Sequence, residues 1–355
     1  MERLKKLLIA PTLTIRQALK QMDIAAEKIL FVVDDKNTIL GVVTDGNIRR
    51  WILSGKHLTC SITKAMNKKP VTIGENYTVE QAKEIMTKNT IECLPVVSNE
   101  RKIISAIWWH DFFKKKTAIK KKLNLPVVLM AGGEGTRLFP FTRVLPKPLM
   151  LIGDKPILEH IMDRFHDYDC KLFYLSVNYK SNIIKAYFDD FQHPYLIKYI
   201  KEAKPLGTAG GLRYLKNKIK TPFFVSNCDV LIEADYLDIL NFHKKNNNAI
   251  TLIGSMKHYT IPYGVCKLTK GGVLNSIEEK PEYDFLVNTG MYILQPSVLN
   301  KIPKNKPYHM TELINACMAS GEKVGVYPLS EKSWLDIGQL EELKDTLKRF
   351  EVDKQ

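Results

Sequence analysis

The chain has 355 residues, with 53 Lys and Arg against 38 Asp and Glu, so its formal net charge is +15. This length allows two domains, each with its own core. No apolar run approaches the roughly 20 residues that a membrane helix needs. The first residues also lack the long apolar core of a signal peptide. We therefore expect no membrane partner and a cytoplasmic protein.

The six cysteines stand singly, without a Cys-x-x-Cys pair or a Cys/His cluster. The sequence thus predicts neither a zinc site nor a disulfide framework, and free thiols fit the reducing cytoplasm. The positive charge is spread as lysine, with one dense segment from Lys114 to Lys122. No aromatic platform or recognition-helix motif accompanies it, so we expect no nucleic-acid partner. The positive field instead favours anionic small substrates such as nucleotides.

The first third of the chain contains an internal repeat. TIRQALKQM (Thr14–Met22) recurs with changes as TVEQAKEIM (Thr78–Met86), an offset of 64 residues (78 − 14). The same offset places LFVVDDKNTILGVV (Leu30–Val43) over LPVVSNERKIISAI (Leu94–Ile107). Each copy predicts a threonine N-cap, an amphipathic helix, an apolar strand, a polar turn and a second strand. A unit of this size that cannot bury its apolar face alone is expected to pack against its twin.

This arrangement resembles the cystathionine-β-synthase-type (CBS) pair, or Bateman module, an α+β unit. In that family a Gly-x-x-Thr-x-x-Asp stretch after the second strand often holds an adenosyl ribose and phosphate. The first copy keeps Gly41 and Thr44 but has Asn47 for Asp, while the second keeps Asp111 but has Trp108 for Thr. Two roles stay open: a regulatory nucleotide at Thr44, Asn47 and Asp111, or a structural, oligomerising role. Because CBS pairs commonly stack in twos, we expect a homo-oligomer.

The lysine-rich segment after Phe113 is typical of a charged connector, and a new series of apolar strands starts at Leu125. We predict a CBS pair over residues 1–117 (repeats about 8–56 and 62–115), a linker over 118–124, and a larger domain over 125–355. In the larger domain, apolar strands alternate with segments of helical spacing, among them TAGGLRYLKN (Thr208–Asn217). This alternation predicts an α/β fold with a mainly parallel sheet and helices on both faces. Ligands of such sheets bind beyond the carboxyl ends of the strands.

The first strand of the larger domain runs into the glycine-rich segment AGGEGTRLFPFTRVLPKPL (Ala131–Leu149). Its spacing fits neither the GxGxxG dinucleotide fingerprint nor the P-loop GxxxxGK[ST]. Three glycines still let the backbone present N–H groups to an anion: Gly132, Gly133 and Gly135. Arg137 adds a forked phosphate donor, and Lys147, between two prolines, adds a mobile point charge. Together they predict a phosphate-binding loop rather than a plain turn.

The same segment resembles the signature GGxGTRLxPxTxxxPKPL of sugar-1-phosphate nucleotidylyltransferases, and the similarity continues in order to about Phe350. The further matching segments are EAKPLGTAGGL (Glu202–Leu212), VSNCDVL (Val225–Leu231), YGVCKL, SIEEKPEY, VNTGMYIL and WLDIG. The resemblance implies a Rossmann-like nucleotidyltransferase domain. It also implies a reaction in which a sugar 1-phosphate attacks the α-phosphorus of a nucleoside triphosphate and pyrophosphate leaves. Positioning and charge neutralisation carry such chemistry.

The resemblance also implies residue roles. The catalytic set is Arg137, Lys147, Asp229, Lys280 and Asp336. The nucleotide-binding set is Gly132, Gly133, Gly135, Thr136, Gly207 and Thr208. The sugar-phosphate set is Gly264, Glu279, Lys280 and Asn288. Asp229 and Asp336 would share Mg²⁺, which favours carboxylate oxygens and substrate phosphates. The remaining histidines fit no constellation and are expected on helix surfaces: His160, His166 and His243.

The substrates follow less directly. PLGTAG (Pro205–Gly210) resembles guanylyltransferases and some other transferases more than the thymidylyl branch. The order of CBS pair and nucleotidylyltransferase resembles the glucosamine-1-phosphate guanylyltransferases of the bacterial legionaminic acid pathway. We therefore expect GTP and glucosamine 1-phosphate, with mannose or glucose 1-phosphate and GTP, UTP or CTP open. An alternative of another class is a catalytically inactive, nucleotide-sensing scaffold, against which the retained cations and carboxylates argue.

Overall fold

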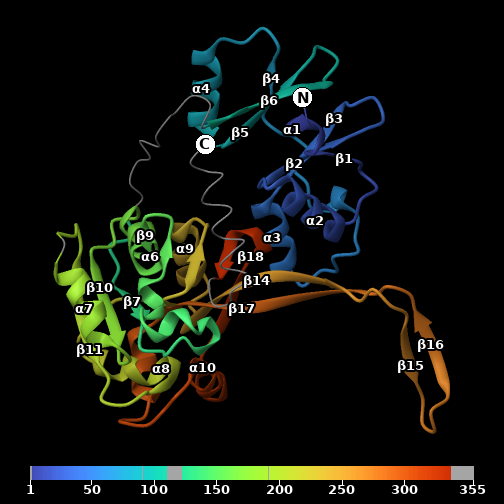
Figure 1. The fold of residues 1–355 in the computed structure, drawn as a ribbon. Helices are drawn as coiled ribbons and strands as arrows, with labels where there is room; N and C mark the ends of the chain where they lie inside the picture. Colours follow the sequence, from blue (N-terminus) through green and yellow to red (C-terminus); the bar gives the residue numbers. More distant parts are fainter. Residues whose placement is uncertain (1, 90, 110–121, 191, 337–355) are drawn as a thin grey trace. The chain divides into compact units, whose positions relative to one another are not determined.

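The structure is a computed structural model that describes residues 2–89, 91–109, 122–190 and 192–336 (Figure 1). The chain divides into two compact units. The first comprises residues 1–119 with Ser330–Lys332, and the second comprises 120–329 with 333–355. The predicted linker lies largely outside the described residues, so the exact domain boundaries stay a prediction. No helix among the described residues is long and apolar enough to cross a membrane.

The first unit contains the repeat that the sequence predicts. Its first copy consists of α2 (Ile15–Ala25), β2 (Ile29–Val33), β3 (Ile39–Thr44) and α3 (Asp45–Leu53). The second consists of α4 (Val79–Asn89), β5 (Cys93–Val97) and β6 (Ile103–Trp108). The short strands β1 (Leu8–Ile9) and β4 (Ile73–Gly74) complete two three-stranded sheets, ordered β1-β2-β3 and β4-β5-β6. The matching helices and strands are offset by the predicted 64 residues (79 − 15, 93 − 29 and 103 − 39).

The two copies begin in the same way because both start with a Thr-x-x-Gln capping box. The Thr14 hydroxyl accepts from the Gln17 N–H at 3.2 Å, and the Gln17 side chain accepts from the Thr14 N–H at 2.9 Å. Thr78 and Gln81 repeat this pair at 3.2 and 2.9 Å. Each reciprocal pair satisfies backbone donors that a helix start leaves without partners.

Main-chain hydrogen bonds join the two copies. The Ile39 N–H donates to the Arg101 carbonyl at 3.0 Å, and the Ile103 N–H donates to the Asn37 carbonyl at 3.0 Å. The polar turns between the paired strands are thus bonded reciprocally to each other. The predicted packing of each copy against its twin is confirmed.

A seven-stranded mixed sheet forms the centre of the second unit, in the order β11-β10-β7-β12-β17-β14-β18. The strands are β7 (Val127–Met130), β10 (Leu172–Val177), β11 (Leu196–Lys201), β12 (Phe223–Asn227), β14 (Ile250–Thr260), β17 (Glu282–Leu294) and β18 (Val324–Leu329). β11, β10, β7 and β12 are parallel, as are β14 and β18, whereas β17 runs antiparallel to both of its neighbours. The predicted mainly parallel α/β sheet is confirmed.

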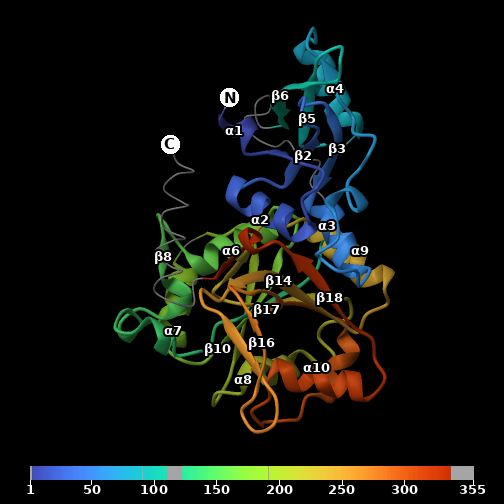
Figure 2. The ribbon, with the colours of Figure 1, turned by 90° about the vertical axis from the view of Figure 1, so that its right-hand side faces the viewer.

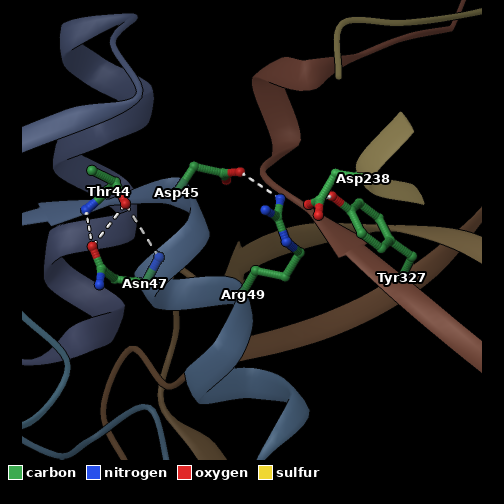
Figure 3. Close-up of polar contacts among 6 residues, drawn as sticks. All are labelled: Thr44, Asp45, Asn47, Arg49, Asp238 and Tyr327. Carbon is green, nitrogen blue, oxygen red and sulfur yellow. Dashed lines mark hydrogen bonds and ion pairs between the residues drawn. The ribbon is translucent and has the colours of Figure 1, made fainter. Parts of the chain in front are cut away.

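Helices cover both faces of this sheet (Figures 1 and 2). Val127 and Leu129 of β7 belong to a buried cluster with α6 (Ile157–His166), α7 (Ser181–Asp189) and α9 (Tyr236–Lys245). Val128 belongs to a second cluster with α10 (Met310–Ala319). Successive side chains of a strand point to opposite faces, so this near-continuous apolar strand fills two cores at once. Within the second unit, the Tyr327 hydroxyl of β18 donates to the Asp238 carboxylate of α9 at 2.6 Å (Figure 3).

Three smaller pairs of strands complete the second unit. They are β8 (Leu151–Ile152) with β9 (Lys155–Pro156), β13 (Val230–Ile232) with β19 (Trp334–Asp336), and β15 (Val265–Leu268) with β16 (Leu274–Glu278). β14 and β17 pair along their whole length, while β18 accompanies β14 only as far as Ser255. Beyond it they form a two-stranded ribbon that carries β15 and β16 at its far end (Figure 1).

Two expectations need correction. The segment TAGGLRYLKN, expected as one helix, is a single turn α8 (Gly207–Gly210) followed by a 3-10 helix (Gly211–Leu215). Glycines carry little intrinsic helical preference, and here they serve close packing. His243, expected on a helix surface, is fully buried. Its Nδ1 lies 2.9 Å from the Thr251 hydroxyl and its Nε2 lies 3.0 Å from Gln295 Nε2. These hydrogen-bond partners offset the cost of burying the ring.

The other two histidines are also not ordinary surface residues. Both His160 and His166 on α6 are half-buried. The His160 Nε2 lies 2.8 Å from the carbonyl oxygen of Ile152. None of the three histidines is therefore fully exposed on a helix surface, because α6 and α9 each bury several of their side chains.

Candidate active site

The glycine-rich loop and Asp229 lie at the same edge of the sheet. The loop follows β7 and Asp229 follows β12, and these parallel neighbours pair with Asn227 beside Met130. Carboxyl ends of parallel strands are where such sheets bind ligands. Sequence segments almost 100 residues apart therefore meet at this edge, as the strand pattern predicts.

Lys147 and Asp229 form a buried ion pair at this edge. Lys147 begins a 3-10 helix (Lys147–Leu149), and its Nζ donates to Asp229 Oδ2. Each residue is 8% exposed. Two charges so far from water remain ionised only when they are paired. The pair therefore holds a cation and a carboxylate side by side. The second carboxylate oxygen, Asp229 Oδ1, accepts no hydrogen bond from the described residues.

Gly135 makes the position of Lys147 achievable. Its φ is +68°, and a Cβ there would lie 3.0 Å from both Lys147 Cβ and Thr142 Cγ2. The buried Thr142 hydroxyl donates to the Gly135 carbonyl at 2.9 Å and fixes the turn. Only a glycine takes this conformation without strain and admits the lysine stem. Gly135 thus has a structural role in the placement of Lys147, and its contact with a phosphate stays a prediction.

Part of the loop is exposed to solvent. Thr136 and Arg137 are exposed, and within the described residues the Arg137 guanidinium has no hydrogen-bond or ion-pair partner. Gly133 has no atom within 4 Å of an added Cβ, whereas a Cβ on Gly132 would come within 3.3 Å of the Asn178 backbone nitrogen. Arg137 is therefore available for an anion at the mouth of the loop.

The Cys228 thiol beside Asp229 is chemically quiet. Burial, with a smaller contribution from the neighbouring Asp229 charge, raises the pKa of Cys228 to about 12. A thiol in this state is not a nucleophile at neutral pH. The site therefore offers charge and position rather than a covalent thiol nucleophile.

The late aspartate of the sequence prediction comes to the same place along the backbone. β19 pairs with β13 antiparallel, and Asp336 stands opposite Val230, the residue after Asp229. The side chain of Asp336 lies outside the described part of the chain. Carboxylate oxygens are the ligands Mg²⁺ prefers, so the donor chemistry of these two residues fits that ion. Whether they hold it stays a prediction.

The second glycine motif packs against the start of α10. Gly207 has a φ of +76°, and an added Cβ would lie 2.8 Å from the Tyr308 carbonyl oxygen. The Thr208 hydroxyl accepts from the Met310 N–H at 2.9 Å. In this structure both residues therefore hold the loop against the helix start, and their predicted contact with a nucleotide stays a prediction.

Glu202 is a residue of this motif to which the sequence analysis gave no role. Its carboxylate is 6% exposed and accepts from the Ser176 hydroxyl at 2.5 Å and from the Leu206 N–H at 3.0 Å. A Cβ on Gly211 would lie 2.5 Å from Glu202 Oε1. The carboxylate thus anchors the loop that carries Gly207. A charged residue opening a glycine motif was the available signal in the sequence.

Of the predicted sugar-phosphate residues, Asn288 lies on β17 and is exposed. Its Nδ2 donates to the Tyr292 hydroxyl at 2.7 Å, and its Oδ1 accepts from the Gly290 N–H at 3.1 Å. Gly290 has a φ of +88°, and an added Cβ would lie 2.5 Å from Asn227 Nδ2. The Asn288 segment is thereby packed beside the end of β12, two residues before Asp229.

The remaining acceptor residues lie elsewhere. Gly264, Glu279 and Lys280 are all exposed at the junction between the ribbon and the β15–β16 hairpin. Lys280 has a φ of +46° and no ion-pair partner within the described residues. The structure groups these three residues with one another but not with Lys147 and Asp229, since the ribbon carries them away from the sheet (Figure 1).

In the first unit, Thr44 and Asn47 bind each other (Figure 3). Asn47 Oδ1 accepts from the Thr44 N–H at 2.9 Å and the Thr44 hydroxyl at 2.7 Å, and the Asn47 N–H donates to the Thr44 hydroxyl at 3.3 Å. Arg49 pairs with Asp45 at 3.0 Å on the same helix. Asp111 lies outside the described residues. Thr44 and Asn47 thus have a helix-capping role, and their nucleotide role stays a prediction.

The geometry defines a nucleotide-handling α/β domain, and comparison with known proteins agrees. The chain belongs to the nucleotidyl transferase family, whose family model matches residues 126–351. The CBS domain family matches residues 5–54 and 61–107. The predicted fold class and the combination of the two domain types are confirmed.

Individual relatives are similar to the larger domain. A mannose-1-phosphate guanyltransferase of Yarrowia lipolytica is 34% identical over 221 residues, 60% of this chain and 60% of that protein. A probable mannose-1-phosphate guanylyltransferase 2 of Oryza sativa is 31% identical over 225 residues, 61% and 62% of the two chains. The crystal structure of HddC from Yersinia pseudotuberculosis is 26% identical, with a TM-score of 0.51, and covers 64% of this chain and 99% of that one. The chain thus spans about 60% of the length of the curated relatives it matches.

Proposed function

We propose that the protein is a sugar-1-phosphate guanylyltransferase that transfers GMP from GTP to a hexose 1-phosphate. The observation that carries this proposal is the buried Lys147–Asp229 pair beside the glycine loop. The pair lies at the carboxyl ends of the parallel strands, the edge at which α/β sheets bind ligands, and this position supports the proposal. The PLGTAG form of the second glycine motif and the names of the guanylyltransferase relatives support GTP as the donor.

In the proposed reaction, an oxygen of the sugar 1-phosphate attacks the α-phosphorus of GTP. The new phosphorus–oxygen bond forms as the bond to pyrophosphate breaks, so no protein nucleophile is needed. Backbone N–H groups near Gly133 and Gly135 bind the triphosphate, and Arg137 neutralises the departing pyrophosphate. Lys147 stabilises negative charge at the α-phosphate. Asp229 and Asp336 would hold Mg²⁺, which supplies charge neutralisation at the phosphates when bound.

The proposed acceptor is a hexose 1-phosphate. We propose glucosamine 1-phosphate, for surface glycan or legionaminic acid synthesis, because the order of domains resembles enzymes of that pathway. Mannose 1-phosphate is the second candidate, and the relatives named mannose-1-phosphate guanylyltransferases favour it. Glu279, Lys280, Gly264 and Asn288 are proposed to bind the sugar phosphate. Hydroxyl-level contacts decide between the sugars.

A screen of pyrophosphate release tests these assignments. It crosses GTP, ATP, UTP and CTP with the 1-phosphates of glucosamine, N-acetylglucosamine, mannose and glucose, with Mg²⁺ present. Release with GTP and one hexose 1-phosphate supports the proposal and identifies the sugar. Release only with another nucleotide contradicts the guanylyl assignment. A folded protein that releases pyrophosphate with no pair supports the inactive-scaffold alternative.

The CBS pair is proposed as an oligomerising module with an optional regulatory nucleotide. Its two copies are held to each other by backbone bonds, and the Thr44–Asn47 pair is engaged in capping. A nucleotide that bound the pair would raise the melting temperature of the full chain. A cytoplasmic location is proposed with it, on the sequence grounds given above.

A further inference from the structure

One part of the second unit carries predicted site residues away from the site. The arm consists of residues 256–286: the outer halves of β14 and β17 with the β15–β16 hairpin between them. The pairing of β14 with β18 ends at Ser255. Five further pairs, from Met256–Leu286 to Thr260–Glu282, continue the ladder, and the Ile261 N–H then donates to the Pro281 carbonyl at 3.0 Å. At about 3.4 Å per residue the ribbon extends roughly 17 Å past the sheet before the hairpin begins.

The hairpin at the tip of the arm has two unlike faces. Cys266 lies opposite Ile277, and Leu268 lies opposite Leu274. Cys266 and Leu268 are two residues apart on one strand and share a face. A register shift between Lys267 and Leu268 brings Leu274 opposite Leu268, so the two cross-strand pairs together form one apolar face. The other face carries Val265, Lys267, Ser276 and Glu278, with a 3.2 Å ion pair between Lys267 and Glu278.

The apolar face of the hairpin is uncovered. Leu268 is 63% exposed, Leu274 51% and Ile277 59%, and Cys266 is exposed as well. An isolated two-stranded hairpin is at best marginally stable in water. A contiguous exposed apolar face rimmed by charges marks a contact with another protein surface. The composition of this face therefore indicates that it packs against another surface.

The apolar face ends at the predicted sugar-phosphate residues. A Cβ on Gly264 would lie 3.0 Å from Glu279 Oε2 and 3.2 Å from Ile277 Cγ2. The Glu279 carboxylate therefore borders the apolar face, and Lys280 follows it directly. Any surface that covers the face also meets Glu279.

The surface that fits is the nucleotidyltransferase domain of a second copy of this chain. The proposed reaction needs the arm residues Glu279 and Lys280 in one site with Lys147 and Asp229. The continuous β14–β17 ladder points the arm away from the sheet that bears those two residues (Figures 1 and 2). In a second copy the arm likewise points away from its own Lys147 and Asp229, so a two-fold exchange of arms would complete both sites at once.

We propose that the arm of one copy completes the acceptor side of the active site of a second copy. This inference rests on the proposed function and extends it. Folding the arm back onto its own domain would require the ladder to break between Met256 and Ile261. The two arrangements differ in which chain supplies Lys280, and that difference can be measured.

The first test is complementation between two inactive chains, using full-length protein. Asp229→Asn removes the body half of the site, and Lys280→Ala removes the arm half. Heteromers carrying one chain of each kind are purified through two different tags. Exchange of arms gives each pair one intact site, so we expect about half the wild-type rate of pyrophosphate release.

Controls make the result specific. A heteromer of Asp229→Asn with Lys147→Met has two damaged bodies and should stay inactive. Lys267→Ala, on the polar face of the hairpin, should keep wild-type activity. If both single variants are inactive and their heteromer is inactive as well, the arm acts within its own chain and the inference is wrong. If wild-type protein itself releases no pyrophosphate, the proposed function fails instead.

The second test does not depend on activity. Cys266 is exposed, Cys60 is half-buried and the other four cysteines are buried. In a Cys60→Ser chain, Cys266 is labelled with a light-activated cross-linker, and chains of normal and heavy nitrogen are mixed before illumination. Cross-links from Cys266 of one isotope to residues 131–149 of the other support arm exchange. Cross-links to that segment confined to single chains overturn it.

Discussion

Lys147 and Asp229, 82 residues apart in the chain, meet as a buried ion pair where β7 and β12 end. Their side chains are 10% and 11% exposed. Burying a charge is costly unless a partner compensates it, so each of these residues depends on the other. A charge pair at the carboxyl ends of parallel strands fits the phosphate site that we propose, and several consequences of the pairing can be measured.

Removing the cation should cost stability and activity together. Lys147→Met leaves the Asp229 carboxylate buried without its partner, and we expect a loss of about 3 kcal/mol in the free energy of unfolding. Urea denaturation measures this loss. The double variant Lys147→Met/Asp229→Leu removes both charges and should recover much of the stability but none of the activity. Equal stability of the Lys147→Met chain and the wild type would contradict the ion-pair account.

Asp229→Asn tests the catalytic role with little change in shape. The amide keeps an oxygen for Lys147 Nζ but loses the charge that a magnesium ion requires. We expect pyrophosphate release in Mg²⁺ to become undetectable while the circular dichroism spectrum stays that of the wild type. Undiminished turnover would remove Asp229 from the metal site.

Two glycines of the predicted nucleotide loops should respond differently to the same change. Gly207→Ala forces a side chain into a left-handed conformation and within 2.8 Å of the Tyr308 carbonyl, so we expect about 1–3 kcal/mol of destabilisation. Gly133→Ala meets nothing within 4 Å and should leave thermal stability nearly unchanged. Any loss of GTP affinity in the Gly133→Ala chain would then report contact with the nucleotide itself. Similar destabilisation by both changes would contradict the packing account of Gly207.

His243 should make stability depend on pH. Burial lowers the pKa of His243 from 6.5 to about 4, with a smaller effect of the nearby Lys244 charge. Above pH 6.5 both folded and unfolded chains hold it neutral. Between pH 6.5 and 4 only the unfolded chain takes up the proton, so this residue lowers stability by up to about 3 kcal/mol as pH falls through that window.

Urea midpoints at pH 7, 5.5 and 4.5 measure this dependence. His243→Gln removes the titrating group. This variant should lose the same free energy of unfolding at every pH, and its stability should therefore depend less on pH between 6.5 and 4. The exposed His57→Gln is the matched control and should follow the wild type. A His243→Gln profile as steep as the wild type would show that other groups cause the acid dependence.

The N-caps of the CBS pair should carry stability that is independent of nucleotide. Thr44→Ala removes the hydroxyl that caps α3, and we expect a loss of about 1 kcal/mol. Thr14→Ala removes the equivalent cap of α2 and should cost a similar amount. Melting temperatures of the full chain, with and without adenosine and guanosine nucleotides, distinguish the two roles. A nucleotide-induced rise that Thr44→Ala abolishes and Thr14→Ala preserves would establish a ligand role for Thr44.

Local chemistry alone determined much of this protein. The repeat with its threonine N-caps and the alternation of strands and helices each depend on neighbours in the sequence, and the structure confirms them. Short-range hydrogen bonds and side-chain periodicity decide such elements before any long-range contact forms. The same reasoning failed for TAGGLRYLKN, where close packing of glycines against Glu202 and Tyr308 prevails over helical spacing.

Only the tertiary structure decided which distant residues meet. The parallel pairing of β7 with β12 brings Asp229 to Lys147, and the pairing of β13 with β19 brings the Asp336 backbone beside Val230. The burial of His243 depends on Thr251 and Gln295, which no local pattern reveals. The extended ladder likewise places Glu279 and Lys280 on an arm. Strand order and register join residues far apart in the chain, and these long-range pairings are what a linear motif leaves undetermined.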